Sequence, residues 1–250
     1  AREFGWIDAA EAGRRLTKTL ATLRSLERWH GHFYNFYDAR DGVVTSRIAS
    51  TVDSGNLAAA LITVAGLFPE LAADARALAG EMDFGALYDR KKGLLHVAYD
   101  TERGKPIAHY GDHMSEARLA YLVAIAKGDI SRGSWSRLNR EGAPSGSGIA
   151  ASLDGGAMDY LAPLAFFDEP GLDAAVREQM RDAETIGGRS VWGKAESAYL
   201  EKDARGRWLH RYGRFGASSL ASTRYEKSPA KTAPVVSPYS SFLALNAGAD

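Results

Sequence analysis

Apolar residues recur at the 3.6-residue spacing of amphipathic helices over much of this chain, and long irregular connections separate the periodic stretches. Capping residues and proline mark several of the expected starts, among them Asp8, the cluster at 50–54, Pro69 and Pro238. The pattern predicts helices over residues 7–28, 56–67, 69–82, 114–127, 157–167 and 171–186, and from 237 to the end of the chain.

The most apolar of these helices lies within residues 111–129. Its core-facing positions share one face, Ser115 or Asp112 can cap its start, and Gly128 suits its exit. Glu116 and Arg118 are expected on its first turn, ahead of a helix body with no further charge before the last residues. A carboxylate there is either a partner of the helix dipole or a catalytic group.

Several stretches break the helical period. Residues 29–42 are aromatic and turn-rich and predict a loop or short strand, and 84–100 predict a hairpin with its turn at 90–93. Residues 131–156 are rich in glycine and serine, and 192–225 are expected to be irregular or β-like. About seven or eight helices in consecutive pairs, joined by long connections, favour a mainly α fold of the α/α toroid class.

Composition narrows the class of protein. The chain has 250 residues, equal numbers of basic and acidic residues (31 each) and no cysteine. A balanced charge gives no sign of a nucleic-acid or membrane-surface partner, and the apolar runs are too short for a membrane span. The absence of cysteine excludes disulfides, cysteine-ligated zinc and thiol nucleophiles. No signal-peptide pattern is present at the start of the chain.

Three carboxylates stand out because each lies near a predicted helix start or in a loop, beside aromatic or small polar residues: Asp53, Glu116 and Glu196. Hydrolysis or transfer of a glycosidic bond needs two carboxyl groups, and aromatic rings are natural platforms for sugar faces. The rings that could supply them are Trp29, Phe33, Tyr34, Phe36, Tyr37, Trp192 and Tyr199. On residues alone the pattern is weak, because many acids lie near loops.

Histidine spacing offers a competing interpretation. His30 and His32 have strand-like spacing, whereas His109 and His113 have helical spacing and could hold a metal together with Asp112. A solvent-facing or substrate-binding histidine explains the second pair more simply. We therefore expect no metal and no organic cofactor.

Six ordered motifs resemble one family. They occupy residues 32–42 (HFYNFYDARDG), 50–61 (STVDSGNLAAAL), 87–100 (LYDRKKGLLHVAYD), 115–129 (SEARLAYLVAIAKGD), 192–199 (WGKAESAY) and 235–245 (VVSPYSSFLAL). In this order they resemble the glucoamylase-like domain in the middle of cyclic β-1,2-glucan synthases and, more distantly, the endo-β-1,2-glucanases. The resemblance spans the chain from Arg2 to Leu245.

The resemblance implies an (α/α)₆ toroid whose cleft holds a β-1,2-glucan, and anomer-retaining transglycosylation that cyclises the chain. It implies that Glu116 is a catalytic carboxylate, the nucleophile, that Glu196 is its acid/base partner, and that Asp53 handles substrate or a proton. Hydrolysis, or glucan binding without catalysis, remains open. The residues expected to bind the glucan are His32, Tyr34, Tyr37, Asp112, Arg118, Trp192, Tyr199 and Tyr212.

The chain also departs from the family pattern. Where the family carries a glutamate in Met-Phe-Glu-Tyr-Leu, this chain has Met158-Asp159-Tyr160-Leu161. Before the motif that begins with Ser-Glu-Ala-Arg at 115–118, the family often has Tyr-Tyr-Asp, whereas this chain has HYGDHM at residues 109–114. Residues 1–250 are expected to form one domain, truncated at both ends, of a longer chain with flanking glycosyltransferase or phosphorylase domains. A synthase domain would face the cytoplasm at the inner membrane, whereas a stand-alone hydrolase would be periplasmic.

Overall fold

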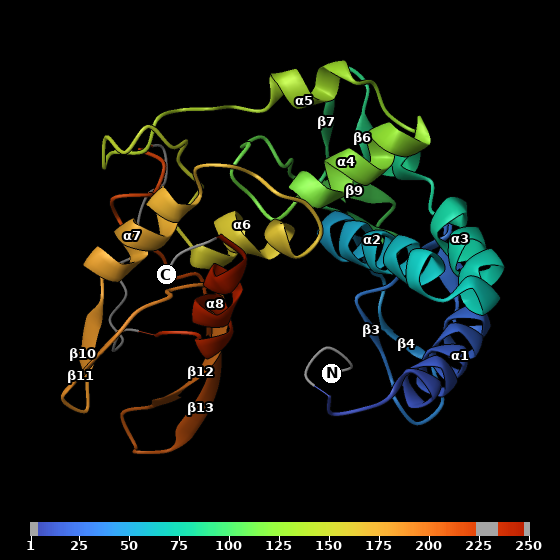
Figure 1. The fold of residues 1–250 in the computed structure, drawn as a ribbon, viewed down its shortest axis with the longest axis horizontal. Coiled ribbons are helices and arrows are strands. Elements are labelled where there is room, and N and C mark those ends of the chain that lie inside the picture. Colours follow the sequence, from blue (N-terminus) through green and yellow to red (C-terminus); the bar gives the residue numbers. More distant parts are fainter. Residues whose placement is uncertain (1–4, 224–234, 248–250) are drawn as a thin grey trace. The chain divides into compact units, whose positions relative to one another are not determined.

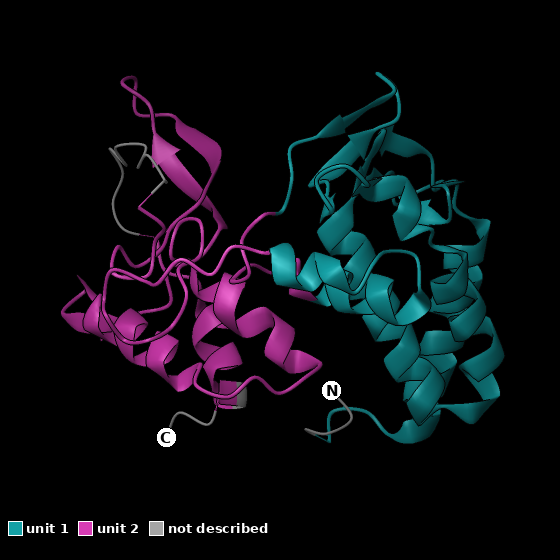
Figure 2. Ribbon diagram, turned by 90° about the horizontal axis from the view of Figure 1, so that it is seen from above, with its two compact units in different colours: residues 1–110, 119–137 teal, residues 111–118, 138–250 magenta. Residues whose placement is uncertain are grey.

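The computed structural model describes residues 5–223 and 235–247. The chain divides into two compact units that are not consecutive in sequence, because a short segment around Glu116 is grouped with the second half of the chain (Figure 2). Unit 1 comprises Ala1–Tyr110 and Leu119–Arg137, and unit 2 comprises Gly111–Arg118 and Leu138–Asp250.

Helices dominate unit 1, and each starts where the sequence supplies a cap. The side chain of Asp8 accepts a hydrogen bond from the Glu11 amide at 2.7 Å, and that of Ser50 accepts one from the Asp53 amide at 3.2 Å. α2 packs along α3, and α1 also contacts α3 (Figure 1). The helices are α1 (Ala9–Ser25), α2 (Thr51–Leu67), α3 (Ala72–Glu81, after the 3₁₀ turn Pro69–Leu71), α4 (Arg118–Lys127, whose first residue is grouped with unit 2) and α5 (Gly133–Arg137).

The strands of unit 1 are short and pair antiparallel. β5, β8 and β9 form a three-stranded sheet, whereas β1–β2, β3–β4 and β6–β7 are two-stranded pairs. The nine strands are β1 (Arg28–Trp29), β2 (His32–Phe33), β3 (Phe36–Tyr37), β4 (Val44–Ser46), β5 (Ile48–Ser50), β6 (Tyr88–Asp89), β7 (Leu94–Leu95), β8 (Ala98–Asp100) and β9 (Lys105–Ile107).

The buried side chains of unit 1 come from its helices and from its hairpin. Leu78 of α3, Leu95 of β7 and Tyr121 of α4 are all at most 1% exposed. The Tyr121 hydroxyl donates to the Tyr110 carbonyl and accepts from the Leu95 amide, each at 2.8 Å. This buried phenol therefore satisfies its polar end while its ring contributes apolar burial.

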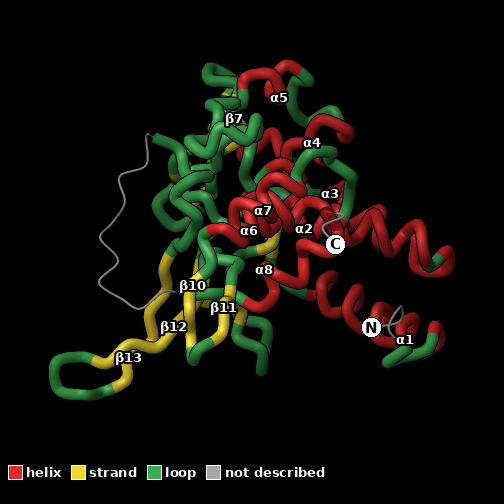
Figure 3. Tube along the Cα trace, turned by 60° about the vertical axis from the view of Figure 1, so that its left-hand side comes forward, coloured by secondary structure: helices red, strands yellow, loops and turns green. Residues whose placement is uncertain are grey.

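Unit 2 combines short helices with two antiparallel hairpins, one of β10 and β11 and one of β12 and β13 (Figure 3). Its apolar core gathers Tyr160 and Leu161 of α6, Leu172 and Val176 at α7, and Leu220 from the segment after β13. Gly187 and Gly188, with φ of +59° and +76°, make the two-residue turn between β10 and β11. The elements are α6 (Ala157–Leu161, continued by the 3₁₀ turn Ala162–Ala165), α7 (Asp173–Arg181), β10 (Glu184–Ile186), β11 (Arg189–Val191), β12 (Ser197–Lys202), β13 (Trp208–Gly213) and α8 (Pro238–Leu243, continued by the 3₁₀ turn Ala244–Ala247).

Three of the predicted elements need correction. Residues 84–87 form a 3₁₀ turn because the side chain of Asp83 accepts a hydrogen bond from the Gly85 amide, so the predicted first strand of the hairpin shrinks to β6. The helix predicted over 171–186 stops at Arg181, and residues 184–186 pair with β11 instead. The helix predicted from Met114 begins at Arg118.

Other predictions agree with the structure within its described residues. The 90–93 turn joins β6 to β7, and a helix starts at Pro238. The β-like stretch predicted up to Tyr225 is present as β12 and β13, while Tyr225 itself, Arg2 and the end of the last predicted helix at 248–250 lie outside the described residues. None of the described helices combines the length and apolar character that a bilayer span requires.

Candidate active site

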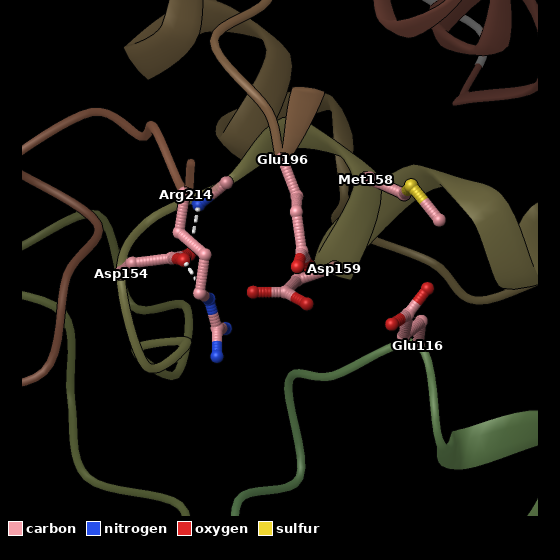
Figure 4. A pocket seen from close by; sticks show the side chains of 7 residues that line it. Glu116, Asp154, Met158, Asp159, Glu196 and Arg214 are labelled. Atoms are coloured by element: carbon pink, nitrogen blue, oxygen red, sulfur yellow. Dashed lines mark hydrogen bonds and ion pairs between the residues drawn. The ribbon is translucent and has the colours of Figure 1, made fainter. Parts of the chain in front are cut away.

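A small acidic pocket lies entirely within unit 2. Four carboxylates line it together with one guanidinium group, and Figure 4 shows Glu116, Asp159 and Glu196 extending into the same space. The side chains come from four separate segments, so only tertiary folding can assemble them. The lining residues are Glu116, Asp154, Gly156, Met158, Asp159, Glu196 and Arg214.

Glu116 lies in the turn before α4, and the neighbouring Arg118 anchors that turn. The Arg118 side chain is fully buried; its Nη2 donates to the carbonyls of Asp159 and Tyr160, each at 2.8 Å, and its Nε donates to the Ser115 carbonyl at 3.2 Å. Its Nη1 forms an ion pair with Glu169. One guanidinium group thus joins the segment that carries Glu116 to α6, which carries Asp159.

The structure corrects three expectations about this segment. Glu116 is not on the first helical turn, because the helix begins two residues later at Arg118. Arg118 cannot reach a glucan in this structure, because its side chain is fully enclosed by protein. The Ser115 hydroxyl is buried without a hydrogen-bond partner, so it does not cap the helix. The other proposed cap, Asp112, accepts a hydrogen bond from the Asn139 side chain at 2.9 Å.

Asp154 is held by a tightly packed glycine loop. Its Oδ1 accepts from the Gly156 amide at 3.0 Å, and its Oδ2 accepts from Arg214 Nε at 2.6 Å (Figure 4). Gly216 lies so close that a Cβ there would be 2.1 Å from the Asp154 carbonyl oxygen. The backbone approach that brings Arg214 onto Asp154 therefore requires glycine at position 216.

Glu196 precedes β12 and is positioned by neighbours on both sides in sequence and space. Ala195 is completely buried, and the Tyr239 hydroxyl donates to the Glu196 backbone carbonyl at 2.8 Å. Tyr212 of β13 is 66% exposed as a residue, yet its hydroxyl hydrogen-bonds the Glu196 carboxylate. Burial of this hydroxyl, and then the Glu196 charge, raises the pKa of Tyr212 well above its ordinary value.

The carboxylates in the pocket outnumber their cationic partner, and this imbalance changes protonation. Burial, the Asp154 charge and then the Glu116 charge raise the pKa of Asp159 well above its ordinary 3.8, against the opposing effects of Arg214 and Ser152. Burial works against the charge on Arg214, but Asp154 and the other nearby carboxylates raise the pKa of Arg214. Asp159 thus retains a proton at pH values at which an ordinary aspartate is ionised.

This raised pKa predicts how stability depends on pH. The folded state holds a proton on Asp159 that the unfolded chain releases near its ordinary pKa, so the stabilising effect is complete below about pH 4 and is lost as pH rises through the folded-state pKa. Asp159→Asn, which is neutral at every pH, should raise the unfolding temperature at neutral pH and change it little near about pH 4. Thermal unfolding of both proteins across this range measures the difference. An equal effect of the substitution at all pH values would contradict the assignment.

The other predicted residues of unit 2 lie at its hairpins and loops. Trp192 packs against the unit 2 core, and its carbonyl accepts from the Ser241 hydroxyl at 3.0 Å. The Tyr199 ring meets Phe215 edge to face, with centroids 5.5 Å apart. Neither ring lines the acidic pocket, so their predicted contacts with glucan remain proposals.

The remaining predicted residues belong to unit 1. Asp53 is exposed on the first turn of α2, and its carboxylate role remains a prediction. His32 is fully buried, with Nδ1 2.9 Å from the Ser54 hydroxyl and Nε2 2.9 Å from the Asp83 carbonyl, and burial lowers its pKa to about 4. His32 is therefore not part of the proposed site, because both of its ring nitrogens make hydrogen bonds inside unit 1.

Tyr34 and Tyr37 are the last two predicted residues of unit 1. The Tyr34 amide donates to the Tyr37 hydroxyl at 2.8 Å, and that hydroxyl donates to the Glu27 carbonyl at 2.7 Å. The Tyr34 ring is 7% exposed and has the Arg47 guanidinium 5.5 Å from its centroid. These contacts order the aromatic segment, and a contact with sugar stays a prediction for both residues.

Sequence reasoning missed Asp154 and Arg214 as members of the site. Asp154 stands in a stretch whose glycine and serine content indicates only a loop, and Arg214 has no motif around it. Asp159 did carry a signal, because it replaces the glutamate that the resembled family has at this place. Asp159, the residue at this departure, lines the pocket.

Comparison with known proteins first defines the class of fold. No family model matches the chain. A glucoamylase-like protein from Bacteroides caccae superposes with a TM-score of 0.64 at 16% identity over 98% of this chain and 67% of its own. An endo-β-1,2-glucanase from Chitinophaga pinensis, solved with sophorotriose and glucose, superposes with a TM-score of 0.64 at 15% identity over 87% of this chain and 61% of its own. The chain therefore has a glucoamylase-like fold, mainly helical with small sheets.

A relative found by sequence shows the type of protein more narrowly than the fold does. The cyclic β-(1,2)-glucan synthase NdvB of Rhizobium meliloti is 32% identical over 179 residues, which cover 68% of this chain. The resemblance inferred from the six motifs is thereby confirmed. The chain spans only 6% of the length of that synthase and about three-fifths of the glucanase structure.

Proposed function

We propose that this chain is a carbohydrate-active enzyme that cleaves and transfers β-1,2-glucan chains with retention of anomeric configuration. The observation that carries the proposal is that Glu116 and Glu196, from two separate motifs, line one pocket. Similarity to a cyclic β-1,2-glucan synthase supports β-1,2-glucan as the substrate class. Transfer to a hydroxyl of the same chain would close a ring.

The proposed chemistry uses the two glutamates in two steps. Glu116 attacks the anomeric carbon as nucleophile while Glu196, in its acid form, protonates the departing glycosidic oxygen. A glucan hydroxyl then attacks the glycosyl-enzyme, Glu196 takes its proton, and Glu116 leaves as a carboxylate. A pair that works in this way needs its carboxyl groups about 5–5.5 Å apart, against roughly 6.5–9.5 Å for inversion.

Asp159 and Arg214 fit this chemistry as tuning groups. An ionised carboxylate near Glu116 makes the negative charge of Glu116 less favourable. Because Asp159 retains its proton, Glu116 can stay anionic beside it. Arg214 neutralises Asp154 through its 2.6 Å hydrogen bond. Carboxyl groups whose environments push their protonation apart are typical of acid–base sites.

The broader architecture is proposed on the same resemblance. The helices would form part of an (α/α)₆ toroid, with residues 1–250 as one domain of a longer chain that carries glycosyltransferase or phosphorylase domains. The structural relatives, whose own chains extend well past the matched part, support this proposal. Asp53 and the aromatic residues of unit 1 would contribute to glucan binding.

Two alternatives remain distinct in their products. Similarity in fold to an endo-β-1,2-glucanase favours hydrolysis as the second candidate, in which water replaces the acceptor hydroxyl. A glucan-binding domain without catalysis is the third, and it would bind oligosaccharides even after loss of both glutamates.

Incubation with linear β-1,2-glucan, followed by mass spectrometry, separates these outcomes. Products one water lighter than the linear chains are expected and indicate cyclisation. Short linear products would assign a hydrolase. Tight binding of the glucan without any product would overturn the catalytic proposal in favour of a binding domain.

A further inference from the structure

A cluster of two histidines and one aspartate lies in unit 1, outside the acidic pocket. One ring nitrogen from each of His96 and His109 and one carboxylate oxygen of Asp89 all lie within 4.8 Å of one another. The three residues come from different segments, and each is partly buried. His109 Nε2 is 3.0 Å from Asp89 Oδ2, and the two imidazole rings have centroids 4.5 Å apart.

The backbone brings these residues together through a local irregularity. The Val97 amide donates to the Ile107 carbonyl at 3.0 Å, and the Tyr110 amide donates to the Leu95 carbonyl at 2.9 Å. Between these two hydrogen bonds, Ala108 and His109 face the single residue His96. This two-against-one arrangement is that of a β-bulge, which redirects a side chain and is frequent beside functional sites.

Ala108 carries the strain of this bulge. Its φ is +36°, a left-handed value that only two non-glycine residues adopt in the described part of the chain. Alanine has no side-chain hydrogen bond to compensate for such a conformation, so the surrounding structure must impose it. This conformation places the Ala108 carbonyl against His96 and the His109 ring against Asp89.

Backbone groups hold Asp89 and His96 in place within this cluster. Asp89 Oδ1 accepts from the Lys91 amide at 2.9 Å and the Lys92 amide at 3.0 Å, which leaves Oδ2 for the histidines. His96 Nδ1 is 3.0 Å from the Ala108 carbonyl, which only accepts, so Nδ1 carries the proton and Nε2 has the free lone pair. Metal-binding histidines are typically oriented by such a carbonyl contact.

The Lys92 side chain contacts this cluster. Its Nζ is 3.5 Å from His109 Nδ1, on the ring nitrogen away from Asp89. An ammonium group donates only, so His109 Nδ1 accepts this hydrogen bond. Nε2 therefore carries the ring proton and donates a hydrogen bond to Asp89 Oδ2. A metal ion at His109 Nε2 would displace that proton, so the neutral ring would carry its proton on Nδ1 and the flexible Lys92 side chain would turn away from the ring.

From this geometry we propose that Asp89, His96 and His109 bind a divalent transition-metal ion, with Zn²⁺ as the best fit. Two imidazoles and one carboxylate suit zinc and its neighbours, whereas calcium and magnesium prefer oxygen ligands throughout. Three protein ligands leave a position for water. This proposal departs from the expectation of no metal, and its ligands differ from the set of His109, His113 and Asp112.

The bound ion would act as a clip within unit 1. Asp89 ends β6, His96 follows β7, and His109 follows β9, so one ion would join the hairpin to the strand segment after β9. This role does not depend on the proposed glucan chemistry. It predicts that the ion slows amide exchange at residues 89–97 and 107–110.

The test uses the whole chain, stripped of metal by a chelator and titrated with Zn²⁺ by calorimetry. One equivalent should bind, and the unfolding temperature should rise with Zn²⁺ concentration. Asp89→Ala, His96→Ala and His109→Ala should each weaken binding by more than the roughly 10–100-fold that loss of a second-shell partner costs. Co²⁺ should give the absorption of a site with nitrogen and oxygen ligands, and excess Ca²⁺ should not displace Zn²⁺.

The matched control is His210→Ala, because His210 is exposed on β13 in unit 2. It should bind Zn²⁺ as the wild type does. Metal-free unfolding temperatures show whether each variant is folded before its affinity is compared. The proposal is overturned if the wild type binds no stoichiometric Zn²⁺, if folded variants at Asp89 and His96 bind it equally well, or if Ca²⁺ competes on equal terms.

Discussion

Glu116→Gln should reduce turnover of β-1,2-glucan by roughly 10²–10⁴-fold or more while the protein stays folded. Glutamine keeps the shape of the side chain but removes the charge needed to attack the anomeric carbon. Glu116 is in a turn that the hydrogen bonds of Arg118 to backbone carbonyls hold in place, and those bonds remain in the variant. Initial rates, together with the unfolding temperature, measure the two effects separately.

Chemical rescue by azide distinguishes the roles of the two glutamates. With azide added, a Glu196→Ala enzyme should recover activity and give a glycosyl azide of retained configuration, whereas Glu116→Ala should give the inverted azide. The double variant should be little worse than either single one, because the two residues act as a unit. Glu102→Gln is the matched control, since Glu102 is exposed in the turn before β9. A folded and fully active Glu116→Gln protein would refute the assignment.

Arg118→Met should cost about 3–5 kcal/mol of folding stability in addition to its effect on turnover. Methionine fills much of the space of the arginine stem, but it leaves Glu169 without its ion pair and removes the side-chain donor from the carbonyls of Asp159 and Tyr160. The Ser115 carbonyl keeps only its hydrogen bond from the backbone amide of residue 118. Loss of these contacts releases the turn that carries Glu116 from α6. We expect a large fall in the denaturant midpoint and a lower kcat at temperatures at which the variant is folded.

Arg177→Met provides the control within the same unit. Arg177 pairs with Asp173 one turn earlier on α7, and its side chain is 58% exposed, against 0% for Arg118. An exposed pair of this kind contributes about 0.3–0.5 kcal/mol. Arg118→Lys should stay well below wild type, because one ammonium group cannot reach all four partners of the planar guanidinium. Equal costs for the Arg118 and Arg177 substitutions would show that the buried network contributes nothing special.

Local signals predicted much of the secondary structure. Asp8 caps α1, Ser50 caps α2, and Gly128, with φ of +80°, ends α4. Such signals act within a few residues, so they are readable from the chain. The exceptions have local or pairing causes: 84–87 turn around Asp83, and 184–186 leave the helical period to pair with β11.

The candidate site was predictable only in part. Glu116 and Glu196 were identified by the motifs around them, whereas Asp154 and Arg214 were not. Their importance comes from a 2.6 Å contact across a long stretch of sequence, which no periodicity reports. Arg118 shows the opposite failure, because its motif suggested substrate binding and its complete burial gives it a positioning role.

By itself, the sequence determined the helical character of the chain, most of its caps and turns and its relation to β-1,2-glucan enzymes, and it singled out two of the acids that line the candidate site. These properties depend on neighbouring residues or on motif order. Tertiary structure alone decided which acids share a pocket, which of them retains a proton, and which histidines meet an aspartate. The physical reason is that charge interactions, burial and metal-ligand geometry depend on distances between residues that the chain brings together only by folding.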